Sequence, residues 1–292
     1  MSLPTKVVIT GSRGQLASAI LRAAPTGISC VPLPREDLDI TDFGAVQARF
    51  LELAPDCVIN GSAYNLVDKA ETEGARAAVE INALGVAILA RAAREIGARL
   101  VHFSTDFVFD GQKRVPYREE DATGPLGVYG ASKLCGENIA LAGSPRNFAI
   151  RVSRLYGPLP QVGTTQKPGG NFPLLMIKLG RERPSLRVVC DQIGSPSYTP
   201  DLARATWELL ALADGGLFHL ANTGEVDFAT YAETALEIAG VKCEVERVTT
   251  ANYGAPAARP LYSTLGCERA WAAGVTPLRP WREALEEFLK SL

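Results

Sequence analysis

The amino-acid sequence predicts an α/β protein in which a doubly wound parallel sheet carries a smaller C-terminal α/β domain. Short apolar runs alternate with longer segments of helical periodicity over the first two thirds of the 292 residues. A glycine-containing turn directly follows the first apolar run. Hydrophobic residues make up 47% of the chain, which is enough to cover a sheet on both faces and to fill a second core.

The apolar runs have the length of buried strands and are separated by segments of helix length. The expected strands of the sheet are KVVIT (6–10), ISCVPL (28–33), DCVIN (56–60), RLVHFST (99–105), FAIRVSRLY (148–156), RVVC (187–190) and GLFHLAN (216–222). The expected helices include QLASAILRAA (15–24), FGAVQARFLELA (43–54) and an Ala-rich segment that ends in ARAAREIGA (90–98). Strand and helix in turn imply right-handed crossovers, so the strands are expected to be parallel.

The pattern changes near residue 226, and this change predicts the smaller domain. Mixed helix and strand patterns follow, among them VKCEVERVT (241–249) and the amphipathic segment PWREALEEFLKSL (280–292). The polar stretch QVGTTQKPGGN (161–171) is typical of a mobile loop. We expect a larger dinucleotide-binding domain and a smaller substrate-binding domain, with a cleft at the carboxyl ends of the strands. Their expected bounds are 1–155 with 187–225, and 156–186 with 226–292.

Composition and charge argue against several classes of protein. The chain has 30 Lys and Arg against 32 Asp and Glu, and a net charge of −2 argues against nucleic acid as a partner. No long apolar segment opens the chain, so we expect no signal peptide, no membrane association and a cytoplasmic location. The six cysteines form no C-x-x-C pair, which favours buried free thiols. His102 and His219 lie in apolar runs and are expected to be hydrogen-bonded core residues, not metal ligands.

The first expected strand leads directly into TGSRGQLA (10–17). Gly11 and Gly14 permit a tight turn and a close approach to a pyrophosphate, whose charge is favoured at the N-terminus of the next helix. Ala17 takes the third small position of this fingerprint, which tolerates alanine. The motif alone is weak, but its place between a strand and a helix predicts dinucleotide binding. The alternative is a plain structural turn.

The end of the second expected strand bears on which dinucleotide is bound. Proteins that bind NAD place an acidic residue there, on the ribose hydroxyls. This chain has PLPRED, which puts Pro34 or Arg35 at that position, and Arg13 lies in the glycine loop. Two guanidinium groups suit a 2′-phosphate because each offers a fork of donors, so NADPH is favoured. In the alternative, both arginines are solvated, Glu36 or Asp37 binds the ribose, and NADH is the cofactor.

Reactive side chains gather at the end of the fourth expected strand and in the helix after it. FSTDFVFDG places Thr105 and Asp106 at the carboxyl edge of the sheet. In GVYGASKLCGE (127–137), Tyr129 and Lys133 are four residues apart and share a helix face. An ammonium near a phenol favours the phenolate, so we expect Lys133 to lower the pKa of Tyr129. Such pairs also arise by chance, and this one gains meaning from the glycine loop and the strand-end hydroxyls.

Together these motifs resemble the extended short-chain dehydrogenase/reductase family, and within it the dTDP-4-dehydrorhamnose reductases. The matching segments cover most of the chain in the family's order: GSRGQLA (11–17), LDITD (38–42), NGSAYNLVDKAE (60–71), INALG (81–85), STDFVFDG (104–111), PYREEDATGPLGVYGASKLCGE (116–137), DQIGSPSYTPDLA (191–203) and RPLYSTL (259–265). The resemblance implies an NADPH-dependent oxidoreductase acting on the C4 ketone of a nucleotide-activated 4-keto-6-deoxy sugar, most closely dTDP-4-dehydro-L-rhamnose. It also implies a homodimer and dependence on Mg²⁺, although no carboxylate cluster in the sequence points to a metal site.

The resemblance assigns roles residue by residue. Thr105, Tyr129 and Lys133 match the family's catalytic residues, and Asp106 and Phe107 fall where the family approaches the sugar. The expected cofactor-binding residues, from the two arginines above and from the resemblance, are Gly11, Arg13, Gly14, Gln15, Leu16, Arg35, Asp39, Ile40, Ala63, Tyr64, Tyr129 and Lys133.

One position departs from the family's pattern. The family's fifth strand has Arg-Thr-Ser-Trp, with the tryptophan in the sugar pocket, whereas this chain has Arg151, Val152, Ser153 and Arg154. A guanidinium would replace stacking by charge-assisted hydrogen bonds, so Arg154 is expected to bind substrate. Three alternatives stay open: another sugar-nucleotide reductase, an epimerase or dehydratase that keeps NAD bound, and a non-catalytic NADP-binding regulatory subunit like the methionine adenosyltransferase beta subunit.

Overall fold

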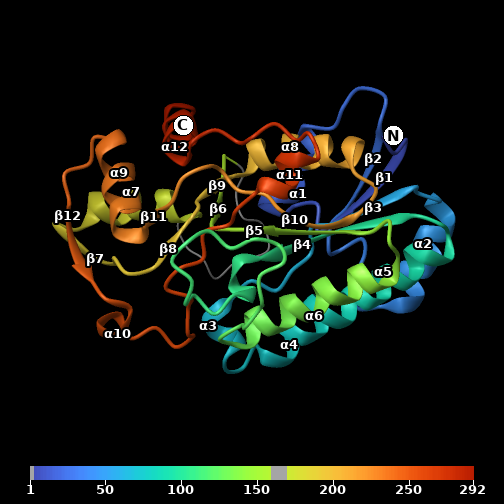
Figure 1. Ribbon diagram of the computed structural model, residues 1–292, viewed down its shortest axis with the longest axis horizontal. Coiled ribbons are helices and arrows are strands. Elements are labelled where there is room, and N and C mark those ends of the chain that lie inside the picture. Colours follow the sequence, from blue (N-terminus) through green and yellow to red (C-terminus); the bar gives the residue numbers. More distant parts are fainter. Residues whose placement is uncertain (1–2, 159–169) are drawn as a thin grey trace.

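The computed structural model describes residues 3–158 and 170–292, and its largest feature is a six-stranded parallel sheet (Figure 1). The strands are β1 (Lys6–Thr10), β2 (Ser29–Leu33), β3 (Cys57–Asn60), β4 (Arg99–Thr105), β5 (Phe148–Val152) and β10 (Gly216–His219). Their order across the sheet is β2, β1, β3, β4, β5, β10, and every neighbouring pair is parallel. The order reverses between β1 and β3, which marks the switch point where doubly wound folds bind ligands. The predicted fold class is confirmed.

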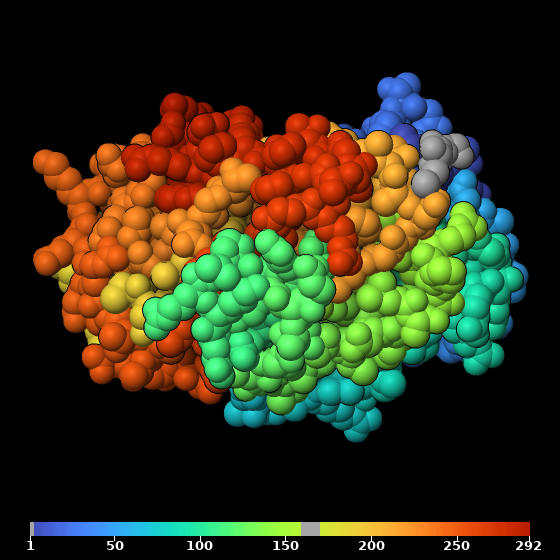
Figure 2. Space-filling view, in the orientation of Figure 1, coloured from blue at the N-terminus to red at the C-terminus, as the bar shows by residue number. Residues whose placement is uncertain are grey.

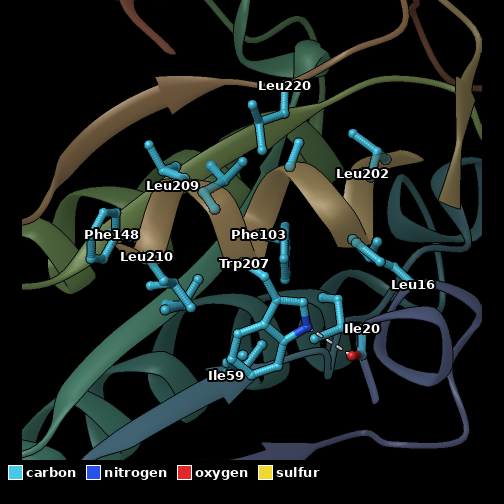
Figure 3. Packing of buried hydrophobic residues seen from close by; sticks show 14 of the residues in the cluster. Leu16, Ile20, Ile59, Phe103, Phe148, Leu202, Trp207, Leu209, Leu210 and Leu220 are labelled. Carbon is cyan, nitrogen blue, oxygen red and sulfur yellow. Dashed lines mark hydrogen bonds between the residues drawn. The ribbon is translucent and has the colours of Figure 1, made fainter. Parts of the chain in front are cut away.

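Helices cover both faces of this sheet. They are α1 (Gln15–Arg22), α2 (Phe43–Leu53), α3 (Val67–Ala70), α4 (Ala75–Val79), α5 (Gly85–Glu95), α6 (Val128–Gly143), α8 (Thr199–Leu212) and α11 (Glu268–Ala272). Side chains alternate along each strand: Val7 and Ile9 pack with α1 and α8, whereas Val8 packs with α2 and α5. Figure 3 shows Trp207 of α8 filling the first of these layers, where its indole N–H donates to the carbonyl of Ile20 at 2.9 Å.

A smaller unit lies beyond the C-terminal side of the sheet, at the left of Figure 1. It contains α7 (Phe172–Glu182), β7 (Ser185–Val189), α9 (Phe228–Ile238), β12 (Glu244–Val248), α10 (Thr250–Tyr253) and α12 (Trp281–Lys290). Two short pairs lie between it and the large sheet, β6 (Leu155–Tyr156) with β9 (Ser197–Tyr198), and β8 (Ile193–Gly194) with β11 (Val226–Asp227). The strand and helix expected at 241–249 and 280–292 are both present. The loop expected at 161–171 lies, except for its last two residues, outside the described part of the chain.

One expected strand was assigned to the wrong sheet. The run 187–190 does not extend the large sheet, because β7 pairs with β12 in a separate sheet that has two strands among the described residues. Leu186 and Val188 are buried against α7 and α9, whereas Arg187 between them is exposed. A strand with one solvent-exposed face does not fit a sheet that is covered by helices on both faces.

The C-terminal part of the chain folds back onto the large sheet. Tyr117, in the segment after β4, forms an isolated parallel bridge with Leu265. Figure 2 shows the corresponding green and red surfaces in contact. Arg259 binds both carboxylate oxygens of Asp68 at 2.9 Å, which fixes the C-terminal segment beside α3.

The cysteines and the helices bear on two further predictions. All six cysteines are free, as expected, but only Cys57 and Cys267 are buried, and Cys135 is exposed. Across the described residues, no helix combines the length and the apolar character that crossing a membrane requires.

Candidate active site

The glycine loop between β1 and α1 is shaped for an anion. Gly11 has φ +59, and a Cβ there would lie 2.8 Å from the backbone nitrogen of Ser62. The N–H of Gly14 donates to the carbonyl of Gly11 at 2.8 Å, which closes the turn. Gly14 is also the N-cap of α1 and supplies no side-chain cap, so the first N–H groups of the helix face the loop. These residues fit a pyrophosphate, while Gln15 and Leu16 are buried behind them.

The residues expected around the adenosine lie after β2. Arg13 forms an ion pair with Glu36, and both side chains are largely exposed, as is Arg35. The Asp39 carboxylate accepts from the N–H and the hydroxyl of Thr41 at 2.9 and 2.7 Å. These hydrogen bonds lower the pKa of Asp39, and the charge of Arg35 adds to the effect.

The segment that contains Ala63 and Tyr64 is held by a residue that the sequence did not single out as functional. Asn82 accepts from the N–H of Tyr64 at 2.9 Å and donates to its carbonyl at 3.0 Å. The same amide donates to the Ser132 hydroxyl in α6 at 3.0 Å. Asn82 lies in a π-helical turn, η1 (Glu80–Leu84), which separates α4 from α5. The only signal in the sequence was its place in the family segment INALG.

Thr105 and Tyr129 meet at the carboxyl edge of the sheet. Thr105 ends β4 and caps the short helix η2 (Asp106–Val108), where its hydroxyl accepts from the Phe107 N–H at 3.2 Å. A Cβ on Gly130 would lie 2.3 Å from the Phe107 carbonyl, so glycine there lets α6 approach this turn. The Tyr129 and Phe107 rings then pack edge to face, with 5.6 Å between the ring centroids. Burial raises the pKa of Tyr129 to about 12, and a hydrogen bond with Thr105 opposes the shift.

Lys133 is also in place on α6, but it points to the sheet. Its Nζ donates to the Phe103 carbonyl and lies 3.4 Å from Nε2 of His102. Burial lowers the pKa of Lys133 to about 7, and the Glu137 carboxylate opposes that shift. The expectation that Lys133 lowers the pKa of Tyr129 is therefore wrong for this structure, in which burial raises that pKa and the Lys133 side chain is directed at β4.

Asp106 is enclosed rather than open to a ligand. Its carboxylate accepts from three hydroxyls: those of Ser263 at 2.7 Å, Ser153 at 3.0 Å and Thr105 at 3.2 Å. Burial raises the pKa of Asp106, and these hydroxyls together with the charge of Arg154 oppose the shift. Asp106 thus orients the Thr105 side chain from behind.

Arg154 follows β5 in a left-handed backbone conformation, with φ +47. Its guanidinium donates to the carbonyls of Val226 at 2.8 Å and Gln192 at 2.9 Å, and it lies 4.0 Å over the Phe228 ring. Burial lowers the pKa of Arg154 to about 10, although the charge of Asp106 opposes this. In this structure the guanidinium joins the end of β5 to the small β8–β11 sheet.

A narrow crevice opens beside Tyr129. It is lined by Val67, Glu71, Phe107, Leu126, Gly127, Tyr129, Gly130, Ala258 and Pro260. Glu71 accepts from the Val128 N–H at 2.8 Å, at the start of α6. The crevice therefore lies between α6 and the C-terminal segment. Within residues 3–158 and 170–292, no group of three or more His, Cys, Asp or Glu side chains could hold a metal ion.

Comparisons with known proteins identify the family of the chain. Residues 5–292 match the family model described as the RmlD substrate binding domain. The chain is 42% identical over 295 residues to dTDP-4-dehydrorhamnose reductase from Mycobacterium tuberculosis, covering 97% of this chain and 92% of that protein. The solved structure of dTDP-4-dehydrorhamnose reductase from Bacillus anthracis in complex with NADP is 35% identical, with a TM-score of 0.91 and 100% coverage of both chains.

A further relative carries a different substrate in its name. The probable dTDP-4,6-dihydroxy-2-methyloxan-3-one 4-ketoreductase of Streptomyces antibioticus is 35% identical over 287 residues, covering 96% of this chain and 93% of that protein. The family model and these identities confirm the resemblance seen in the sequence motifs. The chain belongs to the dTDP-4-dehydrorhamnose reductase family.

Proposed function

We propose that this protein is an NADPH-dependent reductase that converts dTDP-4-dehydro-L-rhamnose to dTDP-L-rhamnose. One observation carries the proposal: the Tyr129 phenol and the Thr105 hydroxyl share the carboxyl edge of the sheet with a glycine loop shaped for a pyrophosphate. The relatives named as reductases of this sugar nucleotide, one of them in complex with NADP, support the substrate and the cofactor.

The chain's own residues supply acid, orientation and binding. NADPH, when bound, supplies the hydride that reduces the C4 ketone. Tyr129 is protonated at neutral pH because its pKa is raised to about 12, so it can donate a proton to the developing alkoxide. Thr105 would turn its one hydroxyl hydrogen from Asp106 to the same oxygen and fix its orientation. Lys133 would bind the nicotinamide ribose hydroxyls.

The preference for NADPH over NADH rests on the two arginines near the adenosine. Arg13 is engaged by Glu36, which lowers its net attraction for an anion. Arg35 is exposed nearby and would supply a fork of donors to a 2′-phosphate. We therefore propose Arg35 as the main 2′-phosphate ligand, with Arg13 assisting.

The proposed reaction is tested by following NADPH absorbance while the purified protein is mixed with dTDP-4-dehydro-L-rhamnose. We expect stoichiometric oxidation of NADPH and formation of dTDP-L-rhamnose. An epimerase or dehydratase would instead turn over sugar with no net loss of reduced cofactor. Tight NADPH binding without NADPH oxidation by any keto-sugar nucleotide would contradict the proposal. It would favour the alternative of a non-catalytic regulatory subunit.

Replacing Arg154 by leucine is expected to raise the KM for the sugar nucleotide at least tenfold. The change removes two charge-assisted hydrogen bonds to the carbonyls of Gln192 and Val226, each worth about 1.5–3 kcal/mol. The β8–β11 sheet would then lose its hydrogen bonds to the residue that follows β5. Steady-state kinetics give the KM, and NADPH fluorescence gives the cofactor Kd, which should not change. An unchanged KM would remove Arg154 from substrate binding.

Several other assignments belong to the same proposal. The free thiols fit a reducing compartment, so we place the protein in the cytoplasm. We also propose a homodimer and a substrate-binding role for the smaller unit. The proposed domains keep the bounds given above, except that β7 joins the smaller unit and α11 packs with the large sheet. Phe107 would shape the sugar side of the pocket, and Asp106 would act there through the Thr105 hydroxyl. Mg²⁺ stays an implication of the family alone.

A further inference from the structure

A row of buried polar side chains crosses the sheet and ends at Lys133. The Thr10 hydroxyl in β1 donates to Oδ1 of Asn60 in β3 at 2.8 Å. Nδ2 of Asn60 lies 3.1 Å from Nδ1 of His102 in β4, and Nε2 of His102 lies 3.4 Å from Nζ of Lys133. All four side chains are buried. The proposed mechanism gives His102 no task.

The amide of Asn60 has a fixed orientation. The backbone N–H of Ser62, which can only donate, lies 3.0 Å from Oδ1 of Asn60. A flipped amide would place its NH2 group against that N–H and leave two donors face to face. Asn60 therefore presents an N–H of Nδ2 to His102.

This orientation determines the tautomer of His102. Because Nδ1 faces a donor, it must accept, and the single hydrogen of a neutral imidazole then lies on Nε2. Burial holds the pKa of His102 well below its ordinary value, so the ring is neutral. The Nε2–H points at Nζ of Lys133.

An N–H can donate to Nζ only when the lysine is a neutral amine with a lone pair. A neutral amine would donate one hydrogen to the Phe103 carbonyl, accept from His102 and keep its second hydrogen available. An ammonium would set one of its three hydrogens against the Nε2–H. The contacts around Nζ thus favour the amine.

We propose that His102 is a positioning residue for Lys133: it holds Lys133 as a neutral amine against β4 in the cofactor-free protein, and Lys133 takes up a solvent proton when NADPH binds. The role of His102 rests on the proposed function, because the ribose hydroxyls of NADPH would supply the new acceptors that favour the ammonium. The bound proton converts the amine to an ammonium, and no other bond changes.

The other ionisable groups around Lys133 come from α6 and β5. Glu137 lies one turn along α6 and favours the ammonium. Arg151 in β5 pairs with Glu137, with 2.9 Å between Nε and Oε2, and offsets much of that carboxylate's charge. Tyr129, one turn back, is a neutral phenol. Burial prevails over Glu137, and the pKa of Lys133 is lowered to about 7.

The first experiment observes the tautomers directly by NMR of the protein labelled with nitrogen-15 histidine. The chain has two histidines, so His102→Gln assigns both rings. His219 is an internal reference for the opposite tautomer. Its Nδ1 lies 3.1 and 3.0 Å from the carbonyl oxygens of Tyr117 and Gly266, which can only accept. We expect hydrogen on Nε2 of His102 and on Nδ1 of His219. Hydrogen on Nδ1 of His102 would overturn the proposal.

The second experiment counts protons taken up on NADPH binding, by calorimetry at pH 8 in buffers of different ionisation enthalpy. A group with a pKa of about 7 is about nine-tenths deprotonated there, so the unmodified protein should take up about 0.9 proton. His102→Leu removes the N–H that favours the amine, which should raise the pKa of Lys133 by about one unit and reduce uptake to about 0.5.

His102→Gln is the matched control, because its amide offers an oxygen to Asn60 and an N–H to Lys133. We expect it to keep the uptake of the unmodified protein. Equal uptake in all three proteins would make His102 an ordinary core residue and overturn the proposal. Absence of any heat of NADPH binding would instead contradict the proposed function, and would remove the cofactor-linked proton uptake along with it.

Discussion

Replacing Tyr129 by phenylalanine is expected to lower kcat by a factor of about 10² to 10⁴ while NADPH binding survives. The variant keeps the ring that packs edge to face on Phe107 at 5.6 Å, so the turn after β4 stays in place. It loses only the hydroxyl proposed to protonate the alkoxide. Absorbance kinetics give kcat, and NADPH fluorescence gives the cofactor Kd.

A matched control separates loss of the acid from disturbance of its neighbours. Thr105→Ser keeps a hydroxyl beside the phenol and is expected to retain most of the activity, because the hydrogen bonds to Asp106 and Phe107 can still form. If Tyr129→Phe retained normal turnover, another group would have to supply the proton and the assignment of Tyr129 would fail.

Replacing Arg151 by methionine is expected to lower the free energy of unfolding by about 3–5 kcal/mol. Arg151 in β5 and Glu137 in α6 are both buried and joined by two hydrogen bonds. Arg151 also contacts Nε2 of His219 at 3.3 Å and lies over the Phe109 ring at 4.9 Å. Methionine fills similar space but leaves a carboxylate buried without its partner. Urea denaturation measures the loss.

Two controls define this prediction. Combining Arg151→Met with Glu137→Leu should recover most of the stability, because no unpaired charge then remains buried. Arg49→Met removes the arginine of the exposed Arg49–Glu52 pair. This change should alter the free energy of unfolding by less than about 1 kcal/mol. If Arg151→Met cost no more than Arg49→Met, the buried pair would contribute nothing beyond a surface contact.

The large sheet could be predicted because each of its strands has a local mark in the sequence. KVVIT gives β1 with the observed bounds, and the glycines that follow it locate the switch point. The run 187–190 is also a short apolar segment, yet β7 pairs with β12 and lies outside the large sheet. Which sheet a strand joins depends on its partner, and β12 lies far along the chain. A short run contains no information about that partner.

The active site shows the same division between local and distant information. Thr105, Tyr129 and Lys133 could be placed at one edge because strand ends and helix spacing are local properties. The direction of Lys133 could not, because it depends on His102 and Phe103 in another element. The sequence predicts that Arg154 binds substrate, but it gives no sign of the two main-chain carbonyls to which the guanidinium donates in this structure. An arginine inside the apolar run FAIRV was a sign of the buried ion pair with Glu137, but the carboxylate it meets lies in another element.

The pairing of β5 with β10 has a consequence for how the chain is made. About 65 residues separate these two neighbours, so at a synthesis rate of about 5–20 residues per second β5 waits roughly 3 to 13 s for its outer partner. During that time a strand destined for full burial presents a row of unpaired N–H and C=O groups on the nascent chain. The last strand of the sheet to emerge from the ribosome thus also closes the edge most able to pair with another chain.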